Sequence, residues 1–302
     1  MRIVVTGGNG FIGSHFVAAA VDKGHRVTVA GLGETPRFPH GRPFEFLPGG
    51  VLGLAAAPAV LSAADIVCHF ASSTTPATSN ADPAADIEAN LVGTVQLLEA
   101  MRRTGNRRIL YLSSGGAVYG RPLATPISED HPLNPMSSYG VGKMAAEKYL
   151  RMYKELYDFS PIVIRPSNPY GPGQETVGQL GVVTTFIHLA LSGNPATFWG
   201  DGSIVRDFIS ISDLTALVLA AAESKITGTY NCGAGVGTSL IELAAIVERA
   251  SGKSLARVVQ PARPFDPPSI VLDIRKAERT FGWSPKVELE DGILTLVETR
   301  SR

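Results

Sequence analysis

The sequence predicts an α/β protein in which a doubly wound parallel sheet is followed by a smaller C-terminal α/β lobe. Three observations lead to this prediction. The chain opens with a short strand, a glycine-rich turn and an apolar helix. Short strands then alternate with helices as far as Arg165, the pattern of a parallel sheet with helices on both faces. The turn-rich stretch Pro166–Gly173 marks a boundary between two lobes.

The composition is that of an ordinary globular chain with a large core. Of its 302 residues, 44% are hydrophobic and 18% charged, and its 27 basic side chains balance its 27 acidic ones. No charge excess therefore favours a nucleic acid or a membrane surface as a partner. Cys68 and Cys232 follow no pattern, which indicates reduced thiols in a cytoplasm. The six histidines show no metal-ligand spacing, so we expect no metal site.

The first strand and helix enclose a glycine-rich turn. The strand is Arg2–Thr6, the turn is Gly7–Gly13, and the helix runs to about Lys23. This order is typical of a dinucleotide-binding turn. Gly10 would let the backbone approach a pyrophosphate, Gly13 would let helix and strand pack closely, and the helix N-terminus would supply N–H donors. The alternative interpretation is a flexible turn that binds nothing.

The second strand, Arg26–Ala30, lacks the acid that usually follows it. In dinucleotide-binding folds a carboxylate about 20 residues past the glycines holds the ribose 2′-hydroxyl. Here no acid stands near Gly31. Either Glu34 reaches back to the ribose, or the space admits a 2′-phosphate held by Arg37. The sequence therefore leaves NAD and NADP both open.

The sheet continues through four more predicted strands. They lie at Phe44–Leu47, Asp65–Ala71, Arg108–Leu112 and Ile162–Arg165, and a long helix from about Pro83 to Thr104 contains Asn90. In a doubly wound sheet, ligands bind at the carboxyl ends of the strands. Those ends are marked here by Gly7, Ala71, Ser114 and Pro166.

Tyr139 and Lys143 form the most informative pair of residues. They lie four apart on a helix that begins after a serine cap, so both side chains share one face. A free phenol has a pKa of about 10 and is a poor base at neutral pH until a fixed positive charge stabilises its phenolate. So tuned, it can take a proton from an alcohol or give one to a ketone. The alternative is two solvated neighbours on a helix surface.

The second lobe contains further helices and then returns to the first. Helices are expected near Val182–Leu191, Ser212–Glu223, Ser239–Ala250 and Glu290–Thr299, with a strand at Gly228–Asn231. We expect residues 1–166, with roughly 205–233 returning, to form the dinucleotide-binding domain. Residues 167–204 and 234–302 would form the second domain.

In this order, the motifs resemble those of the extended short-chain dehydrogenase/reductases. Within them the chain is similar to the NAD-dependent epimerase/dehydratase family of the UDP-galactose 4-epimerase type. The resemblance runs nearly end to end. It comprises the turn 7–13, the pair Tyr139 and Lys143, and the segments Arg165–Gly171, Gly200–Phe208, Arg263–Asp266 and Gly282–Lys286.

The resemblance implies a Rossmann sheet, a role for each matching residue, and a homodimer. Tyr139 would be the acid/base, with Lys143 lowering its pKa and Ser114 assisting. A bound NAD would contact Gly7, Gly10, Phe11, Ile12, Gly13, Phe70, Ala71, Asn90, Ser113, Tyr139, Lys143 and Pro166. The nucleotide diphosphate of the substrate would be held by Asn168, Arg206, Arg263 and Asp266, although surface ion pairs are an alternative for the two arginines. Two copies would pair through the helices Pro83–Thr104 and Ser138–Tyr157.

Two departures from the family pattern bear on the reaction. The catalytic Ser or Thr of the family aligns with Gly115, so that Ser114, one residue earlier, a water, or no group at all would assist Tyr139. Gly116 and Ala117 stand where dehydratases carry an Asp-Glu pair. Because elimination of water from a sugar needs an acid and a base, a 4,6-dehydratase is disfavoured.

Three functions follow, in order of preference. The first is a nucleotide-sugar 4-epimerase, acting on a UDP- or dTDP-hexose through a 4-keto intermediate. The second is a nucleotide-4-keto-sugar reductase, which the missing ribose acid near Gly31 favours. The third is a non-catalytic cofactor-binding protein, which the intact pair Tyr139 and Lys143 disfavours.

Overall fold

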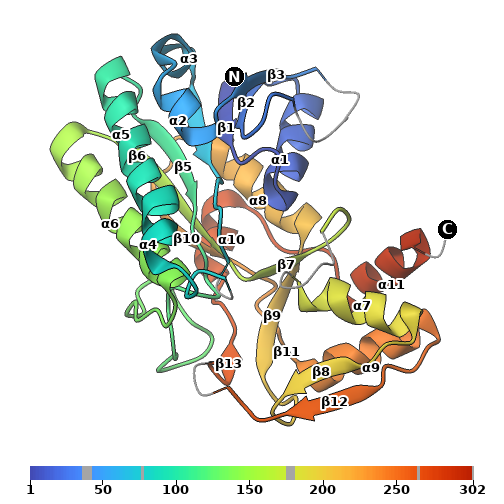
Figure 1. Cartoon of the computed structure of the whole chain (residues 1–302). Helices are drawn as coiled ribbons and strands as arrows, with labels where there is room; N and C mark the ends of the chain where they lie inside the picture. The colour runs from blue at the N-terminus through green and yellow to red at the C-terminus, as the bar shows by residue number, and fades with distance from the viewer. Residues whose placement is uncertain (36–42, 76–77, 175–180, 264–265, 301–302) are drawn as a thin grey trace. The chain divides into compact units, whose positions relative to one another are not determined.

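The computed structural model describes the chain except residues 36–42, 76–77, 175–180, 264–265 and 301–302. The chain divides into two compact units (Figure 1). Unit 1 comprises Met1–Val118, Pro135–Arg165 and Thr215–Tyr230. Unit 2 comprises Tyr119–Asn134, Pro166–Leu214 and Asn231–Arg302. Among the described residues, no helix has the length and apolar character needed to cross a membrane.

Unit 1 is built on the predicted doubly wound sheet. The sheet has seven strands in the order β10-β6-β5-β4-β1-β2-β3. They are β1 (Arg2–Thr6), β2 (Arg26–Gly31), β3 (Glu45–Pro48), β4 (Ile66–His69), β5 (Arg108–Leu112), β6 (Ser160–Pro166) and β10 (Gly228–Cys232). From β3 to β6 all neighbouring strands are parallel. The chain leaves β1 toward β2 and β3 and later continues on the other side of β1 at β4, so the topological switch point lies between β1 and β4.

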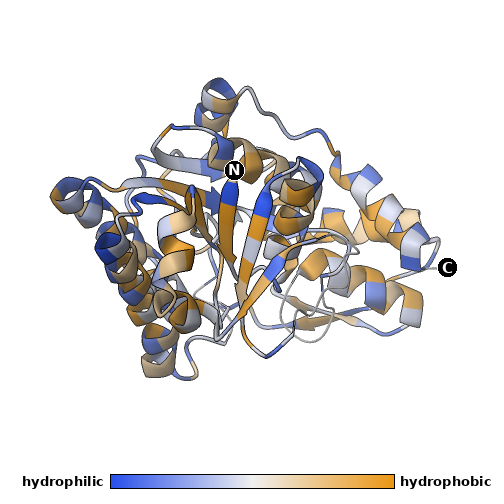
Figure 2. Cartoon of the chain, turned by 90° about the horizontal axis from the view of Figure 1, so that it is seen from above, coloured by the Kyte–Doolittle hydropathy of each residue, from blue (hydrophilic) through white to orange (hydrophobic). Residues whose placement is uncertain are grey.

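Helices cover both faces of this sheet. They are α1 (Phe11–Asp22), α2 (Gly50–Ala55), α3 (Pro58–Ala63), α4 (Pro83–Asp86), α5 (Gly93–Thr104), α6 (Ser138–Tyr157) and α8 (Ile211–Glu223), with a π-helical turn η1 (Ile87–Val92) between α4 and α5. Buried residues of α2, α3, α5 and α6 form one core with the sheet, while α1 lies on the opposite side (Figure 1). The central strands are largely hydrophobic, as a sheet buried on both faces requires (Figure 2).

Several details of unit 1 differ from the sequence prediction, and the bounds of most strands differ by one to two residues. The helix expected over Pro83–Thr104 is interrupted by η1, which contains Asn90. The short helices α2 and α3 were not predicted, because their six residues each are too few to display a helical period. The strand expected at Phe44–Leu47 is shifted by one residue to Glu45–Pro48.

Unit 2 combines small sheets with helices. The strands β11 (Gly237–Ser239), β9 (Val205–Ser210) and β13 (Ser269–Ile270) are neighbours in that order, and β7 (Asn168–Tyr170) also pairs with β9. A separate pair is formed by β12 (Arg257–Gln260) and β8 (Ala196–Trp199). The helices wholly in this unit are α7 (Val182–Ser192), α9 (Leu240–Ser251), α10 (Arg275–Phe281) and α11 (Leu289–Arg300). Ser239 and Glu242 form a capping box that starts α9, which explains why the beginning of this helix could be predicted.

A buried carboxylate ties the segments of unit 2 together. Asp207 on β9 is fully buried. Its Oδ1 accepts hydrogen bonds from the N–H of Ala234 at 2.7 Å and from the Ser167 hydroxyl at 3.2 Å. Its Oδ2 accepts from the N–H groups of Gly235 and Leu272, each at 3.2 Å. Burial raises the pKa of Asp207 to about 6 against the opposing effect of these donors.

Candidate active site

The glycine turn after β1 is fixed by close backbone packing. Gly7 has a φ of 74°, and a Cβ atom there would lie 2.6 Å from the backbone nitrogen of Ala71 at the end of β4. A Cβ atom at Gly13 would lie 2.1 Å from the carbonyl oxygen of Gly7. Both contacts are far shorter than van der Waals distance, so only glycine fits at either position. The turn thus lies against the carboxyl end of β4, at the switch point.

The beginning of α1 presents the features of an anion site. Gly10 is the N-cap residue, no side chain caps the helix, and its first turn contains no acidic residue. The N–H donors of this turn and the positive end of the helix dipole are therefore not capped by a side chain. These are the features that a dinucleotide pyrophosphate requires, so this turn fits NAD, and Phe11 and Ile12 would contribute their N–H groups.

Packing at the end of β2 explains the missing acid. A Cβ atom at Gly31 would lie 2.8 Å from Nδ2 of Asn9 and 2.8 Å from the ring of Phe46. No carboxylate can therefore occupy this position without displacing its neighbours. Glu34 is exposed, and Arg37 lies outside the described residues.

Side chains hold the start of the helix that contains Tyr139. Ser137 caps α6 by accepting a hydrogen bond from the N–H of Gly140 at 3.2 Å. The N–H groups of the two residues between Ser137 and Gly140 are also satisfied. That of Ser138 donates to Asn80 Oδ1 at 2.8 Å, and that of Tyr139 donates to Ser79 Oγ at 3.0 Å. Three side chains thus satisfy N–H groups of the first turn, which fixes the backbone at Tyr139.

Lys143 is buried beside Tyr139, as the four-residue spacing predicts. Its Nζ donates to the carbonyl oxygen of Leu112 at 2.9 Å. The same atom lies 4.9 Å from the ring centre of Tyr111 and 5.6 Å from that of Tyr139. Burial lowers the pKa of Lys143 to about 8, although Glu147 and Asp86 act to raise it.

Ser114 lies near Tyr139 although it stands one position before the expected residue. Burial raises the pKa of Tyr139 to about 12, and a hydrogen bond with the Ser114 side chain opposes this effect. The structure therefore brings together Tyr139, Lys143 and Ser114. Of the three alternatives, namely Ser114, a water and no group at all, the position of Ser114 favours the first.

The other residues predicted to contact the cofactor surround the same strand ends. Asn90 Oδ1 accepts from the N–H of Ser73 at 2.9 Å, just beyond β4. Ser113, directly after β5, donates its hydroxyl to Glu147 at 2.5 Å. Phe70 packs edge-on against Phe16 of α1, with ring centres 5.1 Å apart. Pro166 is the last residue of β6.

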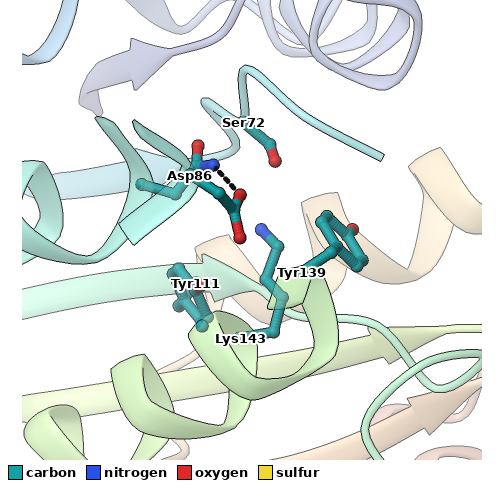
Figure 3. A pocket seen from close by; sticks show the side chains of 7 residues that line it. Ser72, Asp86, Tyr111, Tyr139 and Lys143 are labelled. Carbon is teal, nitrogen blue, oxygen red and sulfur yellow. Dashed lines mark hydrogen bonds between the residues drawn. The ribbon is translucent and has the colours of Figure 1, made fainter. Parts of the chain in front are cut away.

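A small pocket lies at the centre of this site (Figure 3), and some of the residues that line it were not predicted. It is lined by Ser72, Asp86, Asn90, Tyr111, Tyr139, Gly142 and Lys143. Asp86 was missed, although it stands four residues before Asn90 and its Oδ1 accepts from Asn90 Nδ2 at 2.8 Å. That helical spacing could have indicated it. Tyr111 lies on β5, and its ring is in contact with Lys143 of α6; this contact between a strand and a helix could not be predicted from the sequence.

The residues predicted to bind the substrate lie in unit 2. Arg206 donates from Nη1 to the carbonyl oxygens of Val205 at 2.8 Å and Pro267 at 2.9 Å. Burial lowers the pKa of Arg206, and the nearby charge of Asp266 raises it. The guanidinium of Arg263 lies 3.9 Å from the ring centre of Trp199.

The alternative interpretation of Arg206 and Arg263 was that they form surface ion pairs. Asn168 is fixed by donating its side-chain amide to the carbonyl oxygen of Asp207 at 2.9 Å. Arg206 is held by carbonyl oxygens, and Arg263 lies on an aromatic face. Neither arrangement is that of a surface ion pair, and each holds the guanidinium in a defined position.

Known proteins are similar to this chain over its whole length. A relative from Mycolicibacterium smegmatis described as UDP-glucose 4-epimerase is 38% identical, over 99% of this chain and 98% of the relative. UDP-glucuronic acid decarboxylase 4 of Arabidopsis thaliana is 31% identical, over 99% of this chain and 68% of the relative.

Solved structures agree in fold. UDP-glucose 4-epimerase of Thermotoga maritima, with UDP-glucose, matches with a TM-score of 0.92 and 32% identity, covering 100% of this chain and 99% of that one. The Thermus thermophilus enzyme of that name, in complex with NAD, matches with a TM-score of 0.90 and 34% identity, covering 99% and 98%. These matches confirm the predicted fold class.

The family assignment rests on a direct sequence match. The sequence model described as "NAD dependent epimerase/dehydratase family" matches residues 3–233. NAD is therefore the cofactor, which decides the choice that the second strand left open. The chain belongs to the NAD-dependent epimerase/dehydratase family.

Proposed function

We propose that this protein interconverts UDP-hexoses that differ at C4, through a transient 4-keto sugar, with Tyr139 as acid and base. The coarser assignment follows from the relatives: the chain is an NAD-dependent sugar-nucleotide epimerase, as predicted. The observation that supports the finer assignment is the position of Tyr139 beside the buried ammonium of Lys143, whose Nζ lies 5.6 Å from the ring centre, and near the Ser114 side chain.

In the proposed reaction Tyr139 moves one proton in each direction. As a phenolate it removes the proton from O4 of the sugar, and as a phenol it returns the proton when C4 is reduced again. A bound NAD would supply the hydride acceptor and donor for C4. Lys143 stabilises the phenolate through its charge, and Ser114 donates a hydrogen bond to the same oxygen.

Inversion at C4 requires a substrate that is anchored at one end and loose at the other. We assign the anchor to Asn168, Arg206, Arg263 and Asp266 of unit 2. Guanidinium groups suit the diphosphate oxygens, and a carboxylate suits ribose hydroxyls. The carbonyl oxygens that fix Arg206 and the Trp199 ring that supports Arg263 would reduce the entropy lost when a diphosphate binds. The sugar, held less tightly, could then present either face to the nicotinamide.

UDP-glucose and UDP-galactose are the substrates that we propose. UDP-glucose accompanies the similar Thermotoga maritima structure, and the Mycolicibacterium smegmatis relative is described as UDP-glucose 4-epimerase. Purified protein should convert UDP-galactose into UDP-glucose with no net change in the absorbance of reduced nicotinamide. A reductase would consume reduced cofactor against a keto sugar, and a non-catalytic protein would do neither.

We also propose a homodimer formed through α6. One stripe of this helix, including Ala146 and Leu150, packs into the core, while Val141, Tyr149, Met152 and Leu156 are exposed at intervals typical of a second apolar stripe. A second copy of the chain would cover this stripe. Light scattering should give the mass of a dimer at micromolar concentration, and Met152→Glu should lower it toward that of a monomer. A monomer in the unaltered protein would refute this proposal.

The cytoplasm is the compartment that we propose. Cys68 and Cys232 are both free and buried. Burial raises the pKa of both thiols, which keeps them protonated and unreactive. Free thiols of this kind are typical of a reducing compartment, and fractionation of the source cells followed by immunoblotting tests the assignment.

A further inference from the structure

Asp86 is a buried carboxylate at the centre of the pocket (Figure 3). It lies at the end of α4, where the chain enters the π-helical turn. Its Oδ1 accepts hydrogen bonds from Thr74 Oγ1 and, at 2.8 Å, from Asn90 Nδ2. Its Oδ2 accepts from the Ser138 hydroxyl at 2.6 Å. These three donors are neutral, so the hydrogen bonds hold the carboxylate without cancelling its charge.

The other carboxylate near Lys143 is neutralised by a different cation. Glu147 lies one helical turn after Lys143 and is buried. Its Oε2 accepts from Arg165 Nη2 at 2.5 Å, and its Oε1 accepts from Arg165 Nε at 3.0 Å. Ser113 donates to the same carboxylate. Arg165 pairs with Glu147, which still acts to raise the pKa of Lys143, and among the residues that line the pocket Asp86 is the acidic one.

The groups that face Lys143 from the sheet cannot replace that charge. Tyr111 on β5 is buried, and burial raises its pKa well above the usual value, so it stays neutral. On β4, His69 bonds to Thr6 and Thr94, and burial lowers its pKa to about 3, so it is neutral as well. Tyr139, on the same helix as Lys143, is a further titratable neighbour. A buried ammonium without an anion nearby would lose its proton readily.

We propose that Asp86 is a positioning residue of the catalytic pair: its charge keeps Lys143 in the ammonium form, and its hydrogen bond to Ser138 fixes the helix start that holds Tyr139. The side chains of Lys143 and Asp86 point toward one another across the pocket (Figure 3). The inference rests on the proposed function, because it assigns Asp86 a role in the proton transfer of Tyr139.

Removal of the Asp86 charge should shift the pKa values of Tyr139 and Lys143 in the same direction. A nearby negative charge favours the protonated form of both titrating groups, and Asp86 acts to raise the pKa of both Tyr139 and Lys143. The phenol and the ammonium interact, so the two protons are lost in steps that belong to the pair. Without the charge both steps move to lower pH, whichever group loses its proton first.

The first test compares Asp86→Asn with Thr74→Val in the NAD-loaded enzyme. Both variants disturb the same hydrogen bond, and the first alone removes the charge. We expect both limbs of the pH profile of kcat to move to lower pH by about one unit in Asp86→Asn and to stay in place in Thr74→Val. Limbs that stay in place in Asp86→Asn, or that move equally in both variants, would overturn the proposal. Asp86→Ser, smaller and also neutral, gives the same comparison if the Asn variant does not fold.

A second readout does not depend on turnover. The ultraviolet absorbance of tyrosinate is titrated in the NAD-loaded protein, and the same titration of a Tyr139→Phe variant is subtracted. Asp86→Asn should lower the midpoint of this difference curve, whereas an unchanged midpoint would overturn the proposal. A lowered midpoint in a protein that turns over no UDP-hexose would refute the proposed function and leave the electrostatic role of Asp86 standing.

Discussion

Replacing Glu147 by glutamine should strongly destabilise unit 1, because it removes the negative charge that Glu147 places beside the buried Arg165 guanidinium. The side chains of Arg165 and Glu147 are only 5% and 7% exposed. Two hydrogen bonds join them, and Ser113 adds a third to the same carboxylate. Glutamine keeps the shape of the side chain but turns an amide NH₂ group toward donors that need an acceptor.

The expected loss is about 3–5 kcal/mol of unfolding free energy, the cost typical of removing one partner of a buried ion pair. The pair itself contributes much less than this, because both charges were taken out of water to form it. A double variant, Glu147→Leu with Arg165→Met, should therefore be more stable than Glu147→Gln. The effects of substitutions at positions 147 and 165 on the free energy of unfolding are therefore not expected to be additive.

Urea unfolding followed by circular dichroism measures these changes. Tryptophan fluorescence would not serve, since both tryptophans, Trp199 and Trp283, lie in unit 2. Glu155→Gln removes an exposed acid from the same helix and is the matched control, with little expected effect. A loss below about 1 kcal/mol in Glu147→Gln, or a double variant less stable than the single one, would refute the reasoning.

Two further predictions concern the glycine turn and the centre of unit 2. Gly13→Ala should abolish NAD binding and cost about 1–3 kcal/mol, since its Cβ atom meets the Gly7 carbonyl at 2.1 Å. In Gly10→Ala the added Cβ atom would lie 3.2 Å from the same oxygen, so this variant should keep the fold but bind NAD more weakly, as measured by calorimetry. Equal losses of unfolding free energy in the two variants would contradict this prediction. Asp207→Asn should cost about 2–5 kcal/mol, because an amide cannot accept from donors on both sides, whereas the exposed Asp201→Asn should change little in the same urea assay. An Asp207→Asn variant as stable as the Asp201→Asn control would show that the hydrogen bonds of Asp207 contribute little.

The sequence predicted those parts of the site that depend on local pattern. The turn Gly7–Gly13 and the spacing of Tyr139 and Lys143 each lie within one strand-helix or helical segment, so residue type and interval were enough. The parallel sheet followed from the alternation of strands and helices.

The parts that depend on packing between distant segments could not be predicted. Asp86 reaches Ser138 across 52 positions of the chain, and nothing local indicates this contact. Ser114 was one of three alternatives that the sequence left open, because its position relative to Tyr139 depends on how the loop after β5 lies against α6. At Gly31, the absence of an acid was noticed from the sequence, but its cause, the close approach of Asn9 and Phe46, needed the structure.

The account depends above all on the hydroxyl of Tyr139. Tyr139→Phe removes that single oxygen and leaves the glycine turn and Lys143 unchanged. Interconversion of UDP-galactose and UDP-glucose should fall by about a hundredfold to ten-thousandfold, while NAD stays bound at the same stoichiometry. Turnover at the rate of the unaltered protein would contradict the central claim.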